Sequence, residues 1–274
     1  MQRLPSLFVS HGAPTYALEP GLAGAQLGAL GRALPRPTAV LVVSPHWMTR
    51  EAQVTGAATP HTIHDFGGFD PALYDMRYPA QGQPALAARV VQLLRAAGWS
   101  ASVDPDRGLD HGAWVPLLHL YPDHGVPVIQ VSMPARLDAP SAFEYGCALA
   151  PLAHEGVLVV GSGSLTHNLY EFRQGSGAQA GYAAAFTAWI RDAVQAGDAG
   201  KVIAALDDAP HAARAHPTTE HFLPLLVALG AAPSALPATV LPGGIVHGVL
   251  SMESYVFGAQ VQLNPERESM VHHA

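Results

Sequence analysis

Residues 39–47 read AVLVVSPHW, in which five apolar residues lead directly into a serine, a proline and a histidine. Two other stretches are built in a similar way, SLFVSHG at 6–12 and VLVVGSGSLTHN at 157–168. Apolar runs without alternation predict strands that are buried on both faces, as in a largely parallel sheet covered by helices. We therefore expect each of three strands to be followed by one histidine: His11, His46 and His167.

Two more apolar runs, 126–131 and 249–256, are also expected to be strands, and the second alternates more, as an edge strand would. Stretches rich in alanine and leucine with helical spacing lie at 22–34, 84–97, 139–153, 182–196 and 219–229. This alternation of strands and helices predicts an α/β fold with three layers, α/β/α, around a central, largely parallel (mixed) sheet.

The composition fits one folded domain over residues 1–262, followed by a polar C-terminal tail at 263–274. Apolar residues make up 49% of the 274 residues and charged residues 13%, so much of the chain is expected to be buried. The lone cysteine, Cys147, cannot form an internal disulfide and is expected in the core. The net charge is −7 and the basic residues are scattered, which makes nucleic acid a poor candidate partner.

The sequence gives no sign of secretion or of membrane insertion. The first residues lack the long apolar core of a signal peptide. No apolar run approaches the roughly 20 residues of a membrane span. We therefore expect a cytoplasmic protein. Two segments, 59–79 and 174–181, are expected to be long loops of the kind that often cover an active site.

Histidine is unusually frequent, because 15 histidines outnumber the 14 lysines and arginines together. Ligands of parallel α/β sheets bind beyond the carboxyl ends of the strands, where three histidines are expected. His221, in PTTEHFLPLL, is expected in the first turn of a helix capped by Thr218 or Thr219, and His111, in GLDHGAWVPLL, at the mouth of a loop. Neutral imidazole is a common ligand of zinc and iron, so imidazoles converging from different elements predict a metal site with open coordination positions.

Six short motifs occur along the chain in this order: SHGAP at 10–14, SPHW at 44–47, TIHDFGGF at 62–69, DHGAW at 110–114, THNL at 166–169 and EHFLPLL at 220–226. Together they resemble the class III extradiol ring-cleaving dioxygenases, and most closely the branch of DOPA 4,5-dioxygenase-like proteins. The resemblance covers nearly the whole chain and implies a mixed sheet wrapped by helices. It also implies a non-haem, metal-dependent enzyme that opens the aromatic ring of a catechol-type substrate with O2.

The resemblance implies a role for each of five histidines. His11, His46 and His221 match metal ligands. His167 matches a histidine that does acid–base work or acts as a further ligand, and His111 matches a histidine near the substrate. The expected metal is Fe(II), with Zn(II) often found in its place. The implied partners are a small aromatic diol and O2, and a homo-oligomer is compatible with the sequence.

One position departs from part of the family. Related protocatechuate-type enzymes carry a glutamate where His221 stands, and Glu220 is only its neighbour. A site of three histidines keeps more positive charge, which favours an anionic catecholate but also suits Zn(II), so the native metal stays open. Catechol must lose protons on binding and later steps need one back, so a histidine with a pKa near neutrality, here His167, suits both directions.

Two other functions are compatible with the same residues. A zinc hydrolase would use the three histidines to activate a bound water, with Glu220 or Asp110 as the base. A metal-binding protein without turnover would keep only the fold. The stretch GSGSL at 161–165 does not fit the G-x-S-x-G pattern of serine hydrolases in register, and a tight turn after a strand is the simpler interpretation. Strict consumption of O2 distinguishes the dioxygenase from both.

Overall fold

An eight-stranded mixed sheet runs through the centre of the protein, in a computed structural model that describes residues 3–174 and 180–263. The strands lie in the order β4-β3-β5-β2-β6-β1-β10-β7. Their bounds are β1 (Ser6–Ser10), β2 (Ala39–Thr49), β3 (Ala52–Thr55), β4 (Ala101–Asp104), β5 (Val128–Pro134), β6 (Val157–Gly163), β7 (Ala238–Leu241) and β10 (Ser254–Phe257). The four central strands β5, β2, β6 and β1 are parallel. Antiparallel pairs join them to β3 on one side and to β10 and then β7 on the other.

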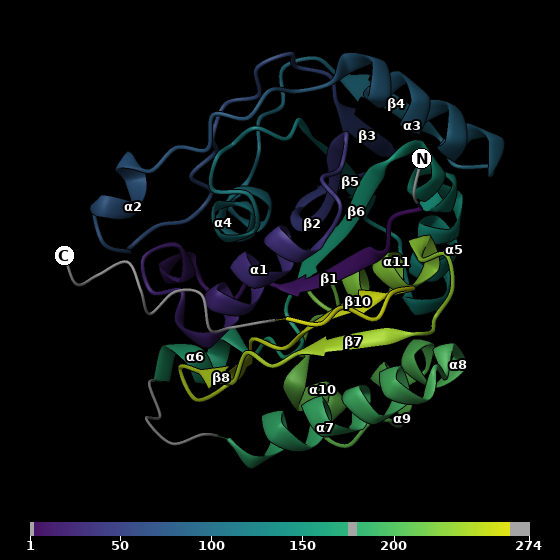
Figure 1. Ribbon diagram of the computed structural model, residues 1–274. Helices are drawn as coiled ribbons and strands as arrows, with labels where there is room; N and C mark the ends of the chain where they lie inside the picture. Colours follow the sequence, from purple (N-terminus) through teal and green to yellow (C-terminus); the bar gives the residue numbers. More distant parts are fainter. Residues whose placement is uncertain (1–2, 175–179, 264–274) are drawn as a thin grey trace.

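Helices cover both faces of this sheet, because successive side chains of each central strand point to opposite cores. Leu7 and Val9 pack in one core, with α1 (Gly21–Ala33) and α4 (His111–Leu120). Phe8 packs in the other core, which is covered by α3 (Pro84–Ala96), α5 (Ala139–Leu149), α7 (Gly181–Ala196) and α11 (Leu223–Ala231). Figure 1 shows α1 and α4 on one side of the sheet and α5 and α11 on the other. The predicted three-layer α/β/α fold is confirmed.

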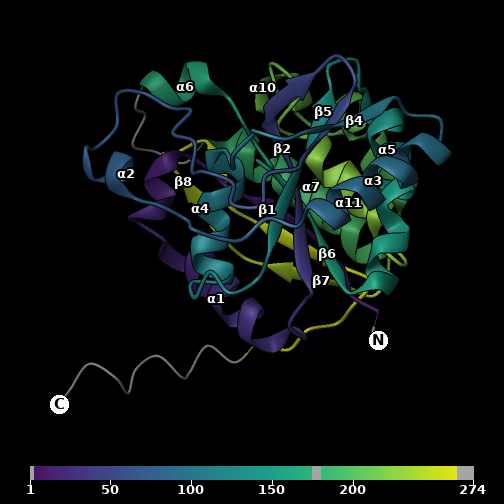
Figure 2. The same cartoon turned by 90° about the horizontal axis from the view of Figure 1, so that it is seen from above.

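Short elements gather at one end of the molecule. They are η1 (Pro14–Ala17), α2 (Ala72–Asp75), α6 (Leu169–Gln174) and a small two-stranded sheet of β8 (Ile245–Val246) and β9 (Leu250–Ser251). Figures 1 and 2 agree in placing α2, α6 and β8 at this end. The remaining short helices are η2 (Ala150–Glu155), α8 (Ala199–Ile203), α9 (Ala205–Asp208) and α10 (Ala212–Ala215).

Two predictions about strands are wrong. The strand that begins at Ala39 does not stop before His46 but continues to Thr49, and its pairing with β5 is irregular between Val43 and Met48. The run 249–256 does not form one edge strand. It divides into β9 and β10. Strand β10 lies between β1 and β7 rather than at an edge, and all four of its side chains are buried.

Two predictions about helices are also wrong. The helix expected from Thr219 begins at Leu223, so His221 precedes it. The physical reason is that the carbonyl of His221 accepts a hydrogen bond from the amide of Ser164 at 2.9 Å, and so does not serve as a helical acceptor. Cys147 lies on the exposed side of α5 rather than in the core.

The predicted loop at 59–79 is irregular apart from α2. Most of the predicted loop at 174–181, and the polar tail at 263–274 apart from its first residue, lie outside the described residues. Within the described part of the chain, no helix combines the length and the apolar character needed to cross a membrane.

Candidate active site

Three histidines from distant parts of the sequence meet at one end of the sheet. His11 follows β1, His46 lies in the irregular part of β2, and His221 precedes α11. One nitrogen from each of the three lies within 4.8 Å of the others. The Nε2 atoms of His11 and His46 are only 3.1 Å apart. The three residues implied as metal ligands are thus close enough to hold one ion.

The position of His221 depends on a close approach between two backbones. An added Cβ on Gly163, the last residue of β6, would lie 2.3 Å from the carbonyl oxygen of His221. The next amide along the chain, that of Ser164, donates to the same oxygen. A side chain at position 163 would therefore push the 219–222 turn, and with it the imidazole of His221, away from β6.

Hydrogen bonds define the orientation of His11. The hydroxyl of Ser162 donates its single proton to the carbonyl of Gly112. The hydroxyl oxygen of Ser162 also lies 3.0 Å from Nδ1 of His11. Because its only proton is already donated to Gly112, this oxygen accepts a hydrogen bond from Nδ1. Nδ1 of His11 therefore carries the proton, and Nε2 faces the other histidines with a lone pair.

For the other two histidines, a carboxylate lies near Nδ1 in place of a serine hydroxyl. Oε1 of Glu220 lies 3.0 Å from Nδ1 of His221, and an ionised carboxylate can only accept. Oδ2 of Asp65 lies 3.6 Å from Nδ1 of His46, close enough to favour a proton on that nitrogen. Each arrangement leaves the Nε2 lone pair directed into the site, as in metal centres where an outer hydrogen-bond partner fixes the tautomer of a ligating histidine.

Burial keeps these imidazoles uncharged. Removal from water, followed by repulsion from the neighbouring imidazoles, holds the pKa of His11 and that of His221 well below the usual value. The same causes lower the pKa of His46 to about 3, although Asp65 opposes them. All three side chains are therefore neutral at physiological pH, which is the state that binds metal.

This burial predicts that the metal-free protein loses stability in mild acid. The unfolded chain binds protons at its histidines near pH 6.5, whereas burial lowers the pKa of the folded chain's His46 to about 3 and of His167 to about 4. The free energy of unfolding should therefore be largest above pH 6.5 and fall towards pH 4, by up to about 1.4 kcal/mol per pH unit for each such histidine. Urea titrations at pH 7.5, 6 and 5 would measure this, and equal stability at all three would contradict it.

His111 is the first residue of α4, where Asp110 caps the helix by accepting from the amide of Ala113. The imidazole of His111 lies with its ring centroid 4.0 Å from that of His46. Asp65 approaches it twice, because its Oδ1 accepts from the amide of His111 at 2.9 Å and lies 3.0 Å from Nδ1. Burial alone would raise the pKa of Asp65, but contact with these two histidines lowers it to about 2, so the carboxylate is ionised.

His167 follows β6, and its ring stacks on that of His221 with centroids 3.5 Å apart. Its nitrogen groups with His221 and Glu220 rather than with His11 and His46. The expectation of a pKa near neutrality is not met, because burial lowers the pKa of His167 to about 4. Glu220 acts in the opposite direction and would stabilise the protonated form.

A cavity of about 490 Å³ opens onto these residues. Four of the five histidines lie on its wall: His46, His111, His167 and His221. Aromatic and aliphatic side chains line much of the rest: Phe66, Phe69, Leu169, Phe172 and Leu250. Arg173 adds a cation. A flat aromatic molecule of modest size fits a cavity of this volume and lining.

Two residues of the site were not singled out from the sequence. Asp65 lies inside the quoted TIHDFGGF motif, but a single acid in a predicted loop gives no signal of its own. Ser162 lies in GSGSL, where a tight turn was expected, yet Gly161 to Gly163 are the last residues of β6. The signal that could have found Ser162 is its place near the carboxyl end of a buried strand.

The chain matches the family described as the catalytic LigB subunit of aromatic ring-opening dioxygenase over residues 7–258. It belongs to this family. The LigB match spans every strand of the large sheet except the first residue of β1, and all five histidines discussed above. The protein is therefore an extradiol, aromatic ring-opening dioxygenase, as the motifs predicted.

Similar proteins agree with this assignment. The chain is 41% identical over 260 residues to "4,5-DOPA dioxygenase extradiol" of Escherichia coli (strain K12), an alignment that covers 93% of this chain and 95% of that protein. It is 40% identical over 256 residues to the protein of the same name from Beta vulgaris, covering 92% and 96%. A crystal structure of an uncharacterized protein from Escherichia coli K12 superposes with a TM-score of 0.77 at 35% identity, covering 93% of this chain and 100% of that one.

Proposed function

We propose that this dioxygenase opens the ring of a catechol-type substrate at one metal ion held by His11, His46 and His221, and that Fe(II) is the active metal. We also propose that residues 1–262 act as one catalytic domain. The contact between the Nε2 atoms of His11 and His46 carries this proposal. With Nδ1 of His11 facing Ser162 and Nδ1 of His46 facing Asp65, the two Nε2 atoms, 3.1 Å apart, would each present a lone pair to an ion.

A cation held by both nitrogens would account for this short contact. Two nitrogen ligands that each bind one ion at about 2.0–2.1 Å lie roughly 3 Å apart when their bonds to it are near a right angle. The donor set of three neutral imidazoles suits both iron and zinc. When bound, Fe(II) would supply the electron chemistry that lets triplet O2 react with an aromatic diol, which redox-inert Zn(II) does not. Zn(II) is expected to occupy the same ligands without supporting turnover.

The protein's own groups would bind the ring and exclude water. Phe66, Phe69 and Phe172 offer apolar surface to an aromatic substrate. Neutral imidazole ligands would bring no negative charge of their own to the ion. The positive charge of the ion would therefore favour the catecholate over the neutral diol. A ring bound against these phenylalanine side chains would displace water, which would strengthen the electrostatic interactions inside.

His167 is proposed as the acid–base residue. With its pKa lowered to about 4 it is a neutral base at pH 7, able to take a proton from a catechol hydroxyl. Once protonated it would face the carboxylate of Glu220, which favours the imidazolium, and from there it can return the proton. His111 is proposed to hydrogen-bond substrate or oxygen, with its ring held by Asp65.

Replacing Asp65 with asparagine should weaken metal binding, because an amide would no longer supply the negative charge beside His46 and His111. Loss of such a partner typically costs roughly 10–100-fold in metal affinity. Competition with a chromogenic chelator would measure this. Asp75→Asn, an exposed acid of the same loop, is the matched control. Equal affinities for the two variants would show that Asp65 does not support the site.

The proposed activity is tested by loading the metal-free protein with Fe(II) under nitrogen and then adding O2 with a panel of small catechols. We expect one O2 consumed per ring opened, a yellow product, and no turnover by the Zn(II)-loaded protein. Hydrolysis of an ester or amide under nitrogen, without O2 uptake on any catechol, would contradict the proposal.

The carboxylates needed by a hydrolase are already engaged. Asp110 is fully buried, caps α4 and accepts from the side-chain amide of Gln130. Glu220 contacts Nδ1 of His221 and the hydroxyl of Thr218. Neither carboxylate lines the cavity, and Asp65, which does, contacts His46 and His111 and with a pKa of about 2 is a weak base.

A further inference from the structure

A fully buried carboxylate, that of Asp110, lies close to two histidines of the candidate active site. Asp110 directly precedes His111 in the chain, and it does not line the cavity on which His46 and His111 lie. A charge that is taken out of water costs free energy unless hydrogen bonds or opposite charges satisfy it. The contacts of this carboxylate therefore indicate which parts of the fold it holds together.

Donors from four segments surround the carboxylate of Asp110. The amide of Ala113, in the first turn of α4, donates to Oδ1 at 3.3 Å, and the side-chain amide of Gln130 on β5 donates to Oδ2. Nη2 of Arg107 lies 3.5 Å from Oδ2, and the hydroxyl of Ser44 on β2 also hydrogen-bonds to the carboxylate. An ionised carboxylate offers about four acceptor positions, so these donors satisfy it.

Two of these donors also bind the backbone of His46. The hydroxyl oxygen of Ser44 accepts from the amide of His46 at 3.2 Å, which leaves the single proton of that hydroxyl for Asp110. Nη2 of Arg107 donates to the carbonyl oxygen of His46 at 3.4 Å, and its guanidinium lies over the ring of Trp47. Asp110 therefore supports both the amide and the carbonyl of His46, in the part of β2 where pairing with β5 is irregular.

The same carboxylate holds the start of α4. Asp110 is the N-cap of this helix, and His111 is its first residue. The helix comes close to β2 here, because an added Cβ on Gly112 would lie 2.3 Å from Oγ of Ser44 and 3.0 Å from Cδ2 of His46. The rings of His46 and His111, with centroids 4.0 Å apart, thus share one buried support although they come from different elements.

We propose that Asp110 is a positioning residue, which fixes the imidazole of His46 relative to that of His111. The proposal rests on the function proposed above, in which His46 is a metal ligand and His111 contacts substrate or oxygen. It gives Asp110 no contact with metal, substrate or O2. Loss of the carboxylate should therefore change metal binding and turnover through the backbone of His46 and the first turn of α4.

Asp110→Asn tests this proposal, because asparagine keeps the size of the side chain and still caps a helix, but places an amide donor among donors. We expect metal affinity to fall roughly 10–100-fold, as for other groups that orient a ligand. The visible absorption bands of the Co(II)-loaded protein should also shift, because they depend on ligand geometry. Asp138→Asn is the matched control, because Asp138 caps α5 through Ser141 and does not line the cavity.

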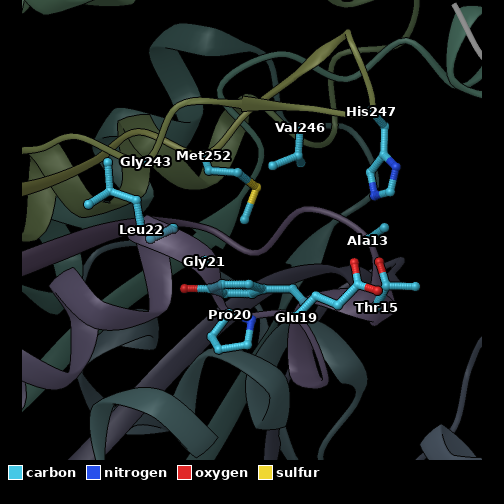
Figure 3. A pocket seen from close by; sticks show the side chains of 12 residues that line it. Ala13, Thr15, Glu19, Pro20, Gly21, Leu22, Gly243, Val246, His247 and Met252 are labelled. Atoms are coloured by element: carbon cyan, nitrogen blue, oxygen red, sulfur yellow. The ribbon is translucent and has the colours of Figure 1, made fainter. Parts of the chain in front are cut away.

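The loss of a negative charge near the site has a control of its own. A smaller cavity of about 330 Å³ lies beside the larger one, and Ala13 lines both. Figure 3 shows Glu19 on the wall of the smaller cavity, where this residue is exposed. Glu19→Gln removes one charge without changing the hydrogen bonds of Asp110, so it should bind metal like the unchanged protein. An equal loss of affinity in Glu19→Gln and Asp110→Asn would overturn the proposal.

Ser44→Ala tests one arm of the arrangement, because it leaves the cap of α4 in place and removes the hydroxyl between Asp110 and the amide of His46. We expect a weaker metal affinity and a shift of the Co(II) bands in the same direction as in Asp110→Asn. Thermal denaturation would show that each variant is folded. Should Asp110→Asn not fold, Ser44→Ala decides by the same measurements.

The positions of the two histidines can also be measured without a metal. A crystal structure of metal-free Asp110→Asn should show the rings of His46 and His111 displaced relative to one another, compared with the unchanged protein. The proposal is overturned if metal affinity, Co(II) bands and ring positions are the same as in Asp138→Asn. An unchanged protein that binds no metal at His46 would instead contradict the proposed function, and the metal-free structures would then decide the role of Asp110.

Discussion

Replacing His46 with alanine is expected to abolish metal binding and turnover while leaving the fold intact. The imidazole borders the cavity and is the least buried of the three proposed ligands, so its removal costs little core packing. Its loss leaves only two imidazoles for the ion. The affinity for Fe(II) should fall by more than the roughly 100-fold that loss of a ligand's hydrogen-bond partner can cost.

Metal content after reconstitution and O2 uptake with a catechol would measure these effects. His154→Ala is the matched control, because His154 is exposed on η2, which precedes β6, whereas the site lies at the other end of that strand. We expect one metal ion per chain in the control and almost none in His46→Ala. A His46→Ala protein that binds one Fe(II) as tightly as the control would remove His46 from the proposed ligand set.

Replacing His167 with phenylalanine is expected to separate metal binding from catalysis. The phenyl ring can keep the stacking contact with His221, where the two rings are nearly parallel at 10° and 3.5 Å apart. It cannot carry a proton. Loss of a general acid–base group typically costs roughly 10²–10⁴-fold in rate, so kcat should fall by that amount while one metal ion per chain is retained.

The same variant distinguishes the two roles that the family resemblance allows for His167. Retained metal with lost turnover supports acid–base work. Loss of the metal would make His167 a ligand instead, against its position beside Glu220 and His221 and away from His11 and His46. Unchanged turnover would exclude both roles.

The sequence predicted the layers of the fold because the central strands are long, apolar and followed by polar residues. It failed where strands are short or their ends are polar. Strands β3, β4 and β7 have four residues each, and β4 carries two exposed side chains, so neither length nor periodicity marks them. Strand β2 extends beyond its apolar part to Thr49. Its polar residues Ser44, Pro45 and His46 lie where its pairing with β5 is irregular.

The sequence also predicted which strands are followed by histidines, but not how the side chains are oriented. The proton positions of His11 and His46 depend on Ser162 and Asp65, which approach them from segments 151 and 19 residues away. No local pattern reports such contacts. The lowered pKa of His167 is likewise a consequence of tertiary burial. An imidazole with a pKa near neutrality would be a mixture of protonated and neutral forms at pH 7, whereas His167 with a pKa of about 4 is a neutral base. The metal-binding and catalytic roles of these histidines remain predictions.

The most direct test of the account is a crystal structure of the protein loaded anaerobically with Fe(II), with anomalous diffraction data collected at the iron edge. We predict one anomalous peak per chain, within bonding distance of Nε2 of His11, His46 and His221. A peak elsewhere, or full iron loading with these three nitrogens unliganded, would contradict the central claim.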